Sequence, residues 1–537
     1  MTPMSTAILS VAVDSSSTVM DPPADPSATP AASRWRAPRR VAAHYAFLVI
    51  LAVGALLRLW QLDAVGFNSD ETVYAGQAAS IANQTAYLPY FPIFRAHPLL
   101  FQTLLSLVYR VEVIDVAGRV LSAAFGVATL VVTYALGKLL FGRRAGLVAM
   151  SLLAVMPYHV TVTRQVLLDG PMVFFATSAL YLLARYCSGH GARWLVASGA
   201  LMGLAAVTKE TAVVLFGGLY CFFVLTHAIK VKIRTIVAAL AVSAVVSISF
   251  PLALRLAGAT RSGGNYLAWQ LFRRANHPVG FYLTAVPPAM GLLVLGIAVA
   301  GLVLDRKQLD WRERLLLAWC AIPIVFFTVM PIKGFQYLLP LAPPVAVLAA
   351  RALTAAGLWA WLTRRVSRWR PALQNAAWAV TVLTLAVPAW ITVQPSASQS
   401  FLAGTGGLPG GREAGVWIDQ NLPRGSTMLT LGPSMANVIA FYGHRQAYGL
   451  SVSPNPLNRN PSYTAIDNAD LQLRQGAIQY AVWDSFSAGR SPSFSERLLS
   501  YVRKYNGVTV HTESVQVDGA DGRPTSVPVI IVYELRP

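Results

Sequence analysis

The sequence predicts an all-α polytopic membrane protein with about eleven transmembrane helices, followed by a small C-terminal extracytoplasmic α/β domain. Of the 537 residues, 55% are hydrophobic and only 12% are charged, and the mean hydropathy is +0.51. A soluble chain of this size needs more polar surface. Apolar runs recur from Ala43 to Val393, whereas the composition beyond them is ordinary.

The apolar runs have the length of membrane-spanning helices. Such a helix needs about 20 mostly apolar residues, and its backbone polar groups must be bonded within the segment because hydrocarbon offers no partners. The predicted spans are Ala43–Trp60, Arg119–Phe141, Ala145–Val162, Pro171–Cys187, Trp194–Thr208, Thr211–Ile229, Thr235–Leu256, Phe281–Leu304, Leu315–Pro331, Tyr337–Ala360 and Ala372–Val393.

The formal net charge of +20 comes from loops between these spans. In a soluble protein this charge would suggest nucleic acid, but short loops rich in Lys and Arg mark the cytoplasmic side of a membrane protein. If the Arg-rich end of the N-terminal tail lies inside, all five later inside loops are basic. They contain Arg143 and Arg144; Arg185 and Arg193; Lys230, Lys232 and Arg234; Arg306, Lys307, Arg312 and Arg314; and Arg364, Arg365, Arg368 and Arg370. We expect a plasma or inner membrane protein with a cytoplasmic N-terminus and no nucleic-acid partner.

Four segments follow from this pattern. Residues 1–42, rich in Pro, Ser and Ala, are predicted to be a disordered cytoplasmic tail, and residues 43–393 the transmembrane domain. Its first outer loop, 61–118, contains a short apolar stretch, Leu99–Val111, that predicts an interfacial helix. Residues 394–411 resemble a linker, and residues 412–537 an α/β domain. Its predicted elements are helices at Glu413–Asn421 and Ser495–Lys504 and strands at Thr427–Leu431, Ala477–Trp483, Val508–His511 and Val527–Tyr533.

Charged residues gather at the outer ends of the predicted spans. They are Asp70, Glu71, Arg95, His97, Arg119, Arg164, Asp169, Lys209, Glu210, His277 and Lys333. Singly, each has a plain structural explanation. Asp70 could cap the helix that starts near Thr72, and Lys209 with Glu210 could mark a helix end at the lipid headgroups. Together on one face, they predict a functional site.

Several short motifs contain these residues. Phe67 to Ala75 has the pattern D-E-x-x-Y-A, His97 to Leu100 the pattern H/K-P-P-L with one proline missing, and Thr208 to Glu210 the pattern T-K-x. Arg164 to Pro171 places Asp169 shortly before a proline, and Gln336 to Pro344 follows R-Y-x-L-P-x-x-P with Gln336 at the basic position. In this order, over roughly Ala43 to Ala350, the motifs resemble those of GT-C membrane glycosyltransferases, specifically bacterial relatives of protein O-mannosyltransferases and of the aminoarabinose transferase acting on lipid A.

The resemblance implies inverting transfer of a hexosyl or pentosyl group from a polyprenyl-phosphate sugar to a glycan, lipid or protein hydroxyl at the outer face. Such a reaction needs a carboxylate to accept the hydroxyl proton and cations or a metal for the departing phosphate. Some relatives use a divalent metal, and the residues here do not decide this. The implied site residues are Asp70, Glu71 and Asp169 for catalysis, with Asp70 the leading candidate for the base; Lys209, Arg119, His97 and Lys333 for the donor phosphate; and Tyr74, Glu210, His277 and Tyr337 for substrate.

Two other functions fit the composition. A transporter or flippase of lipid-linked sugars would share the apolar content, but it should show charges at mid-depth or inverted repeats with broken helices. The sequence shows neither pattern. A structural membrane protein whose outer domain binds a partner would leave the ordered motifs unexplained.

Overall fold

The computed structural model describes residues 36–537 apart from residues 95, 227–228, 259–274, 356–358, 360–368, 396–407, 457, 461, 519–523 and 537. Residues 1–47 and 48–537 form separate compact units. Of the first unit, only the beginning of helix α2 (Arg36–Leu59) is described. Most of the predicted tail and linker, together with Arg95, Arg364, Arg365 and Arg368, therefore lies outside the described residues.

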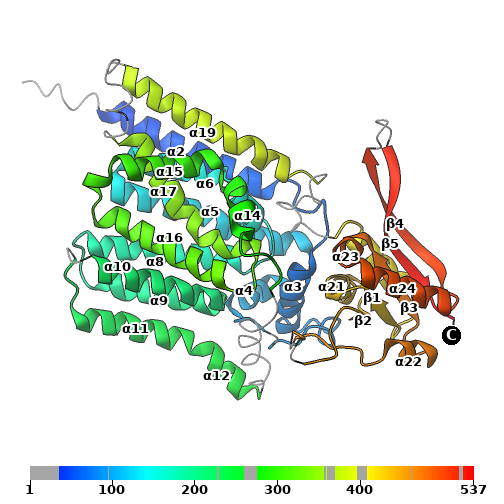
Figure 1. Cartoon of the computed structure of the whole chain (residues 1–537). Helices are drawn as coiled ribbons and strands as arrows, with labels where there is room; N and C mark the ends of the chain where they lie inside the picture. Colours follow the sequence, from blue (N-terminus) through cyan, green and yellow to red (C-terminus); the bar gives the residue numbers. More distant parts are fainter. Residues whose placement is uncertain are drawn as a thin grey trace, which may run out of the picture. The chain divides into compact units, whose positions relative to one another are not determined.

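The residues predicted to span the membrane form helices, many of them packed side by side (Figure 1). After α2 these are α5 (Asp115–Phe141), α6 (Arg143–Ala154), α7 (Pro157–Thr163), α8 (Asp169–Cys187), α9 (Arg193–Thr208), α10 (Val213–Leu225), α11 (Ile233–Ser247), α12 (Ser249–Leu256), α14 (Phe281–Met290), α15 (Leu292–Leu304), α16 (Trp311–Val329), α17 (Ala342–Thr354) and α19 (Arg370–Thr392). Each predicted span coincides with one of these helices or with consecutive helical segments.

The helices differ in how well they match the length of a membrane span. Among the described residues, five helices are long and apolar enough to cross a membrane, or up to seven if each of two bent pairs counts as one span. Helix α9 has only 16 residues and α10 has 13, whereas a span needs about 20. The membrane-type helical fold is thus confirmed, and the number of eleven spans stays a prediction.

Two predicted spans are broken, which the sequence analysis missed. Helices α6 and α7 meet at 62°, and α14 and α15 meet at 95°. Pro157 begins α7, and the residue before a proline is disfavoured in a helix. Gly291 separates α14 from α15 with φ of +94°, a conformation that costs little only for glycine.

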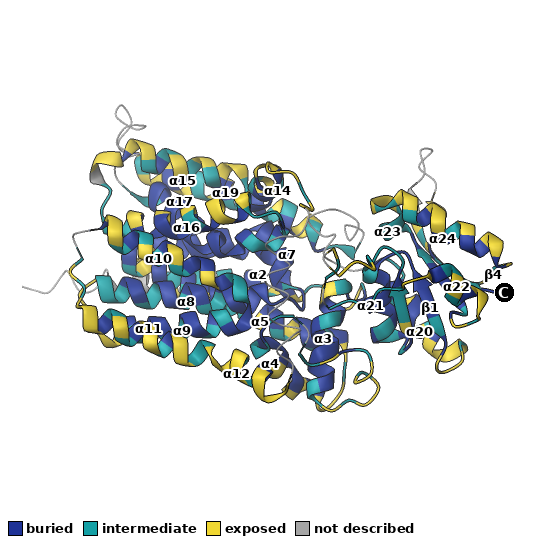
Figure 2. Ribbon diagram, turned by 60° about the horizontal axis from the view of Figure 1, so that its bottom comes forward, coloured by how far each residue is buried: buried dark blue, intermediate teal, exposed yellow. Residues whose placement is uncertain are grey.

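The burial pattern distinguishes inner from outer helices (Figure 2). In the most apolar stretch of the segment Phe335–Thr354, which includes α17, 89% of the residues are buried, against 11% for α11 with α12 and 17% for α19. The outer helices expose large hydrophobic side chains, among them Val245 at 71% and Leu383 at 61%. The high burial places α17 in the interior of the helical region. Exposed apolar surfaces are expected where the solvent is lipid, so α11 and α19 face the bilayer.

The first outer loop contains two helices. Helix α4 (Leu100–Tyr109) confirms the helix predicted at Leu99–Val111, and its 10 residues are too few to span a membrane. Helix α3 (Ser69–Ile81) carries the D-E-x-x-Y-A motif, and most of its residues are buried although its composition is only weakly apolar.

The C-terminal region forms a five-stranded sheet in the order β2-β1-β3-β5-β4. Strands β1 (Thr427–Thr430), β2 (Gln446–Gly449) and β3 (Tyr480–Asp484) are parallel, whereas β4 (Val508–Asp518) and β5 (Pro524–Glu534) join as an antiparallel pair beside β3. The predicted α/β character is confirmed. Strand β2 was missed because its sequence, Gln446 to Gly449, has no β-branched residue and ends in glycine, which is depleted in strands.

Helices cover both faces of this sheet. Met428 faces α20 (Gly411–Asn421) and α21 (Pro433–Tyr442) in one apolar core, and Leu429 faces α22 (Ala469–Arg474) and α24 (Pro492–Lys504) in the other. A short helix, α23 (Ser485–Arg490), follows β3. Successive strand residues point to opposite faces, so alternate positions fill the two cores.

Candidate active site

Helix α3 begins with a capping box that leaves Asp70 without a capping role. The Asn68 side chain accepts hydrogen bonds from the N–H groups of Asp70 (2.9 Å) and Glu71 (3.0 Å), and Glu71 accepts one from the Asn68 N–H (3.0 Å). These bonds satisfy N–H groups that the helix itself cannot pair. The alternative that Asp70 caps the helix is therefore wrong. Asp70 lies exposed on the first turn.

Glu71 and Arg119 form a buried ion pair between the first outer loop and α5. Arg119 donates to both Glu71 oxygens, from Nε at 2.9 Å and from Nη2 at 2.8 Å. The same carboxylate accepts the Val166 N–H at 3.0 Å. Arg119 also donates to the carbonyl oxygens of Leu62, Val65 and Gly66. Because these groups are already engaged in hydrogen bonds, the geometry supports a structural role for both residues.

A second buried ion pair joins two other predicted site residues. Lys209 Nζ lies 2.8 Å from each oxygen of Asp169, and the two residues are 3% and 1% exposed. The same ammonium group lies 4.9 Å from the centre of the Tyr337 ring. Asp169 starts α8, Lys209 follows α9, and Tyr337 lies in the 3₁₀ segment η3 (Phe335–Leu341). Three of the sequence motifs therefore meet at the ammonium group of Lys209.

His97 and Glu210 form a neighbouring pair. His97 Nδ1 lies 3.0 and 2.9 Å from the two Glu210 oxygens, and the His97 ring packs edge-on against Tyr74 of α3 at 5.8 Å. Burial alone would raise the pKa of Glu210, but the charge and hydrogen bond of His97, with Lys209 nearby, hold that pKa below its usual value. Glu210 is thus kept ionised.

Asp70 lies within electrostatic range of this group. Burial is the main cause that raises the pKa of Asp169; Lys209 and His97 oppose the shift, and the charge of Asp70 adds to it. Tyr74, one turn after Asp70 on α3, packs against His97 at 5.8 Å, which places the first turns of α3 beside the His97 pair. The fold thus gathers residues from four elements that are far apart in the sequence.

Lys333 and His277 form a separate group. Lys333 is buried, and its ammonium donates to the Met330 carbonyl at 2.8 Å. His277 stacks on Phe281 at 4.1 Å, and its pKa is lowered, chiefly by burial and further by Arg490 and Lys333. Lys333 precedes Tyr337 by one turn, which connects this group to the Lys209 pair along the chain.

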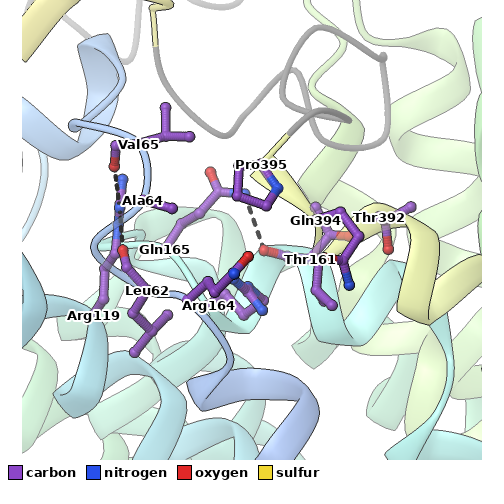
Figure 3. A pocket seen from close by; sticks show the side chains of 12 residues that line it. Leu62, Ala64, Val65, Arg119, Thr161, Arg164, Gln165, Thr392, Gln394 and Pro395 are labelled. Carbon is purple, nitrogen blue, oxygen red and sulfur yellow. Dashed lines mark hydrogen bonds between the residues drawn. The ribbon is translucent and has the colours of Figure 1, made fainter.

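A cavity beside Arg119 and Arg164 is too small for a sugar (Figure 3). It has a volume of about 60 Å³ and is lined by Arg119, Arg164 and Gln165 together with the chain ends of α2 and α19, whereas ligand pockets measure about 300–1,000 Å³. Arg164 donates to the Leu57 and Trp60 carbonyls at 2.8 and 2.7 Å, so it caps the end of α2. In the described part of the chain, no group of three His, Cys, Asp or Glu side chains could hold a metal ion.

The sequence analysis overlooked a buried ionic cluster at the other ends of the helices. Arg351 of α17 pairs with Glu313 of α16 and, at 3.1 Å, with Asp305 at the end of α15. All three residues are buried. Asp305 and Glu313 flank the predicted inner loop, whereas Arg351 lies nine residues inside the predicted span Tyr337–Ala360. A charge within a predicted span was the available signal, and the expectation that the spans hold no such charge is wrong at this position.

The helical region and the C-terminal sheet share several hydrogen bonds. The Tyr442 hydroxyl of α21 accepts the Phe67 N–H at 2.8 Å and donates to Asp115 at the start of α5. Asn437 of the same helix donates to Ser69 Oγ at 3.0 Å. The C-terminal sheet region is therefore hydrogen-bonded to Ser69, the residue that precedes Asp70.

Comparisons with known proteins bear on this arrangement. A family model described as dolichyl-phosphate-mannose-protein mannosyltransferase matches residues 96–254. YkcB of Bacillus subtilis (strain 168), named as a candidate mannosyltransferase, is 35% identical over 133 residues. That match covers 24% of this chain and only 19% of YkcB.

Solved structures match over most of the chain. The crystal structure of ArnT from Cupriavidus metallidurans in the apo state covers 90% of this chain and 97% of its own length, with a TM-score of 0.65 at 15% identity. This chain has the fold of the GT-C glycosyltransferases. ArnT bound to undecaprenyl phosphate gives a TM-score of 0.63 at 16% identity, again over 90% and 97% of the two chains. Archaeal oligosaccharyltransferase AglB from Archaeoglobus fulgidus, in complex with an inhibitory peptide and a dolichol-phosphate, gives 0.53 at 14% identity over 90% and 74%.

Within this GT-C fold, the family match covers only part of the predicted site. His97, Arg119, Asp169, Lys209 and Glu210 lie inside residues 96–254, whereas the first-loop motif with Asp70 lies outside. The expected resemblance to the GT-C class is confirmed, and the roles of individual residues stay predictions.

Proposed function

We propose that this protein transfers a sugar, with inversion, from a polyprenyl-phosphate donor to an acceptor hydroxyl at the outer face of a plasma or inner membrane. The fold it shares with ArnT, which has been crystallised with undecaprenyl phosphate, and with AglB, whose structure is known in complex with a dolichol-phosphate, supports the donor class. The match to a mannosyltransferase family model supports the reaction class.

The single observation that carries the mechanism is the position of Asp70. Its carboxylate is exposed while Asn68 performs the capping, and it stands within electrostatic range of the buried pair of Asp169 and Lys209. Asp70 is exposed and so is accessible to an attacking hydroxyl whose proton it can accept, whereas the Glu71 carboxylate is buried against Arg119. We therefore assign the base to Asp70.

Lys209 and His97 are the candidates for the donor phosphate. Both are held by acidic partners, Asp169 and Glu210, so their positions are fixed before the donor arrives. Cations held in place in a partly buried site stabilise the charge that develops on a leaving phosphate. Lys333, near Tyr337, is a third candidate, whereas the bonds of Arg119 suit a structural role.

Replacing Asp70 by Asn tests the mechanism. An amide cannot take up the hydroxyl proton, and general-base catalysis is typically worth about 100- to 10,000-fold. Asp70→Asn should lose that much turnover while donor binding and protein yield are retained. The measurement is the release of polyprenyl phosphate from a panel of polyprenyl-phosphate sugars by the purified protein with acceptor present.

Two controls accompany this variant. Asp467→Asn changes an exposed carboxylate in the C-terminal sheet region and should leave turnover unchanged. Glu71→Gln should lower stability, because it breaks the pair with Arg119. Near-normal turnover of Asp70→Asn would remove Asp70 as the base. A wild-type protein that moves lipid-linked sugars across vesicles without releasing lipid phosphate would instead favour the flippase alternative.

The proposed topology places eleven spans between residues 43 and 393, the N-terminus in the cytoplasm and residues 412–537 outside. The coincidence of every predicted span with one helix or with consecutive helical segments supports this number. The proposed site residues then lie at the outer ends of their helices, where a lipid-linked donor and an extracytoplasmic acceptor can meet.

A further inference from the structure

A second cavity lies at the β2 edge of the C-terminal sheet. It has a volume of about 250 Å³, just below the usual range of ligand pockets of about 300–1,000 Å³, so it can hold only part of a glycan. Its walls are helix α21, strand β2, residues 462–464 and residues 89–92 of the first outer loop. Both the C-terminal sheet region and the first outer loop therefore contribute to it, and Tyr90 joins the two by donating to the His444 carbonyl at 2.6 Å.

The cavity runs along the free edge of the sheet, because β2 is the edge strand in the order β2-β1-β3-β5-β4. An edge strand presents backbone N–H and C=O groups that are not paired within the sheet. Gln446 to Gly449 of β2 line the cavity, so such groups are available to hydrogen-bond to a ligand there.

The lining is neutral and amphipathic. Among the described residues that line the cavity, none carries a charge. The polar and aromatic ones include Tyr90, Asn437, Gln446, Tyr448 and Tyr463. Neutral amides and hydroxyls can hydrogen-bond to sugar hydroxyls, and tyrosine faces offer apolar area at a low cost in conformational entropy. A phosphate or carboxylate would find no cation among these residues, so an anionic ligand is disfavoured.

We propose that this cavity binds a neutral glycan portion of the acceptor, a proposal that rests on the proposed glycosyl transfer. Gln446 and Tyr448 lie two residues apart on β2, so their side chains share one face of the strand. Asn437, on the opposite wall, donates to Ser69 Oγ at 3.0 Å, and Ser69 directly precedes Asp70. A glycan held here would thus extend toward the residue assigned as the base.

A binding measurement without any donor tests the proposal. The full-length protein in detergent is titrated with neutral linear tetrasaccharides of mannose, glucose and arabinose, and binding is followed by calorimetry. The same sugars carrying sulfate, and a peptide rich in Ser and Thr, serve as comparators. We expect at least one neutral tetrasaccharide to bind at least tenfold more tightly than its sulfated form and than the peptide.

Two variants locate the binding in the cavity. Tyr448→Ala removes a ring from the wall, and Gln446→Ala removes an exposed amide without disturbing a core. Tyr448→Ala should weaken tetrasaccharide binding at least tenfold, and Gln446→Ala should weaken it at least threefold. Gln475→Ala, an exposed amide after α22, is the matched control and should bind as the wild type does. Gel filtration and thermal unfolding verify that each variant is folded.

The outcomes separate this proposal from the proposed function. Absence of binding to all neutral sugars, stronger binding of the sulfated sugars or the peptide, or wild-type affinity in both variants would overturn the glycan site. None of these results depends on donor chemistry. If the protein also transfers sugar, Tyr448→Ala should raise the acceptor KM. Asp70→Asn should instead lower turnover about 100- to 10,000-fold while tetrasaccharide binding stays as in the wild type.

Discussion

Replacing Lys209 by Met should destabilise the protein, because Asp169 would lose its ion-pair partner. The two residues are 3% and 1% exposed, and both oxygen distances to the ammonium are 2.8 Å. Removing one partner of a buried ion pair typically costs about 3–5 kcal/mol. We therefore expect the free energy of unfolding of Lys209→Met to fall by about that amount.

Neutralising both partners should restore part of this loss. In Asp169→Asn with Lys209→Met, no unpaired buried charge is left, so the double variant should be more stable than the sum of the two single changes implies. Residues in direct contact typically show coupling energies of about 0.5–3 kcal/mol, and the two short contacts here favour the upper part of that range.

Denaturant titration of the purified protein, followed by tryptophan fluorescence, measures these free energies. Lys138→Met is the matched control. Lys138 is also near a tyrosine ring, at 5.8 Å from the centre of Tyr134, but it is exposed and its replacement should change stability by less than about 0.5 kcal/mol. A change equally small for Lys209→Met, or strict additivity in the double variant, would refute the stabilising ion pair.

The same double variant separates structure from function. If it folds and still fails to bind a polyprenyl-phosphate sugar, Lys209 contacts the donor directly. If it recovers donor affinity, Lys209 acts only through its pair with Asp169, and the donor phosphate must be bound by other cations.

Two further predictions concern the outer region and the topology. Tyr442→Phe removes a hydroxyl that bonds to both the Phe67 N–H and the Asp115 carboxylate. Because these two groups lose that hydrogen bond, the free energy of unfolding should fall by about 1–3 kcal/mol. An unchanged denaturation midpoint would show that these bonds do not hold the C-terminal sheet region in place. The topology is tested in a variant lacking the three native cysteines. Ser434→Cys should react with an impermeant thiol reagent in intact cells, and Arg143→Cys should not. Labelling of Arg143→Cys alone would show that the protein has the opposite orientation in the membrane.

Much of the fold could be predicted from local patterns. Apolar length located each helix of the membrane region, and the alternation of apolar residues located four of the five strands. Both signals are local, because lipid exposure and the strand pleat act on each segment separately. The breaks before Pro157 and at Gly291 also have local causes, but continuous apolar runs concealed them.

The relations among the site residues depended on tertiary structure. Composition and motifs by themselves predicted that Asp70, Asp169, Lys209 and Glu210 lie near one membrane face. They did not reveal that Asn68 caps α3, that Glu71 is held by Arg119, or that Lys209 pairs with Asp169 across 40 positions of sequence. Ion pairs form between side chains that packing brings together, and sequence spacing reports such contacts only within one helix or strand. The fold therefore decided that Glu71 and Asp169 are buried in ion pairs, whereas Asp70 is exposed.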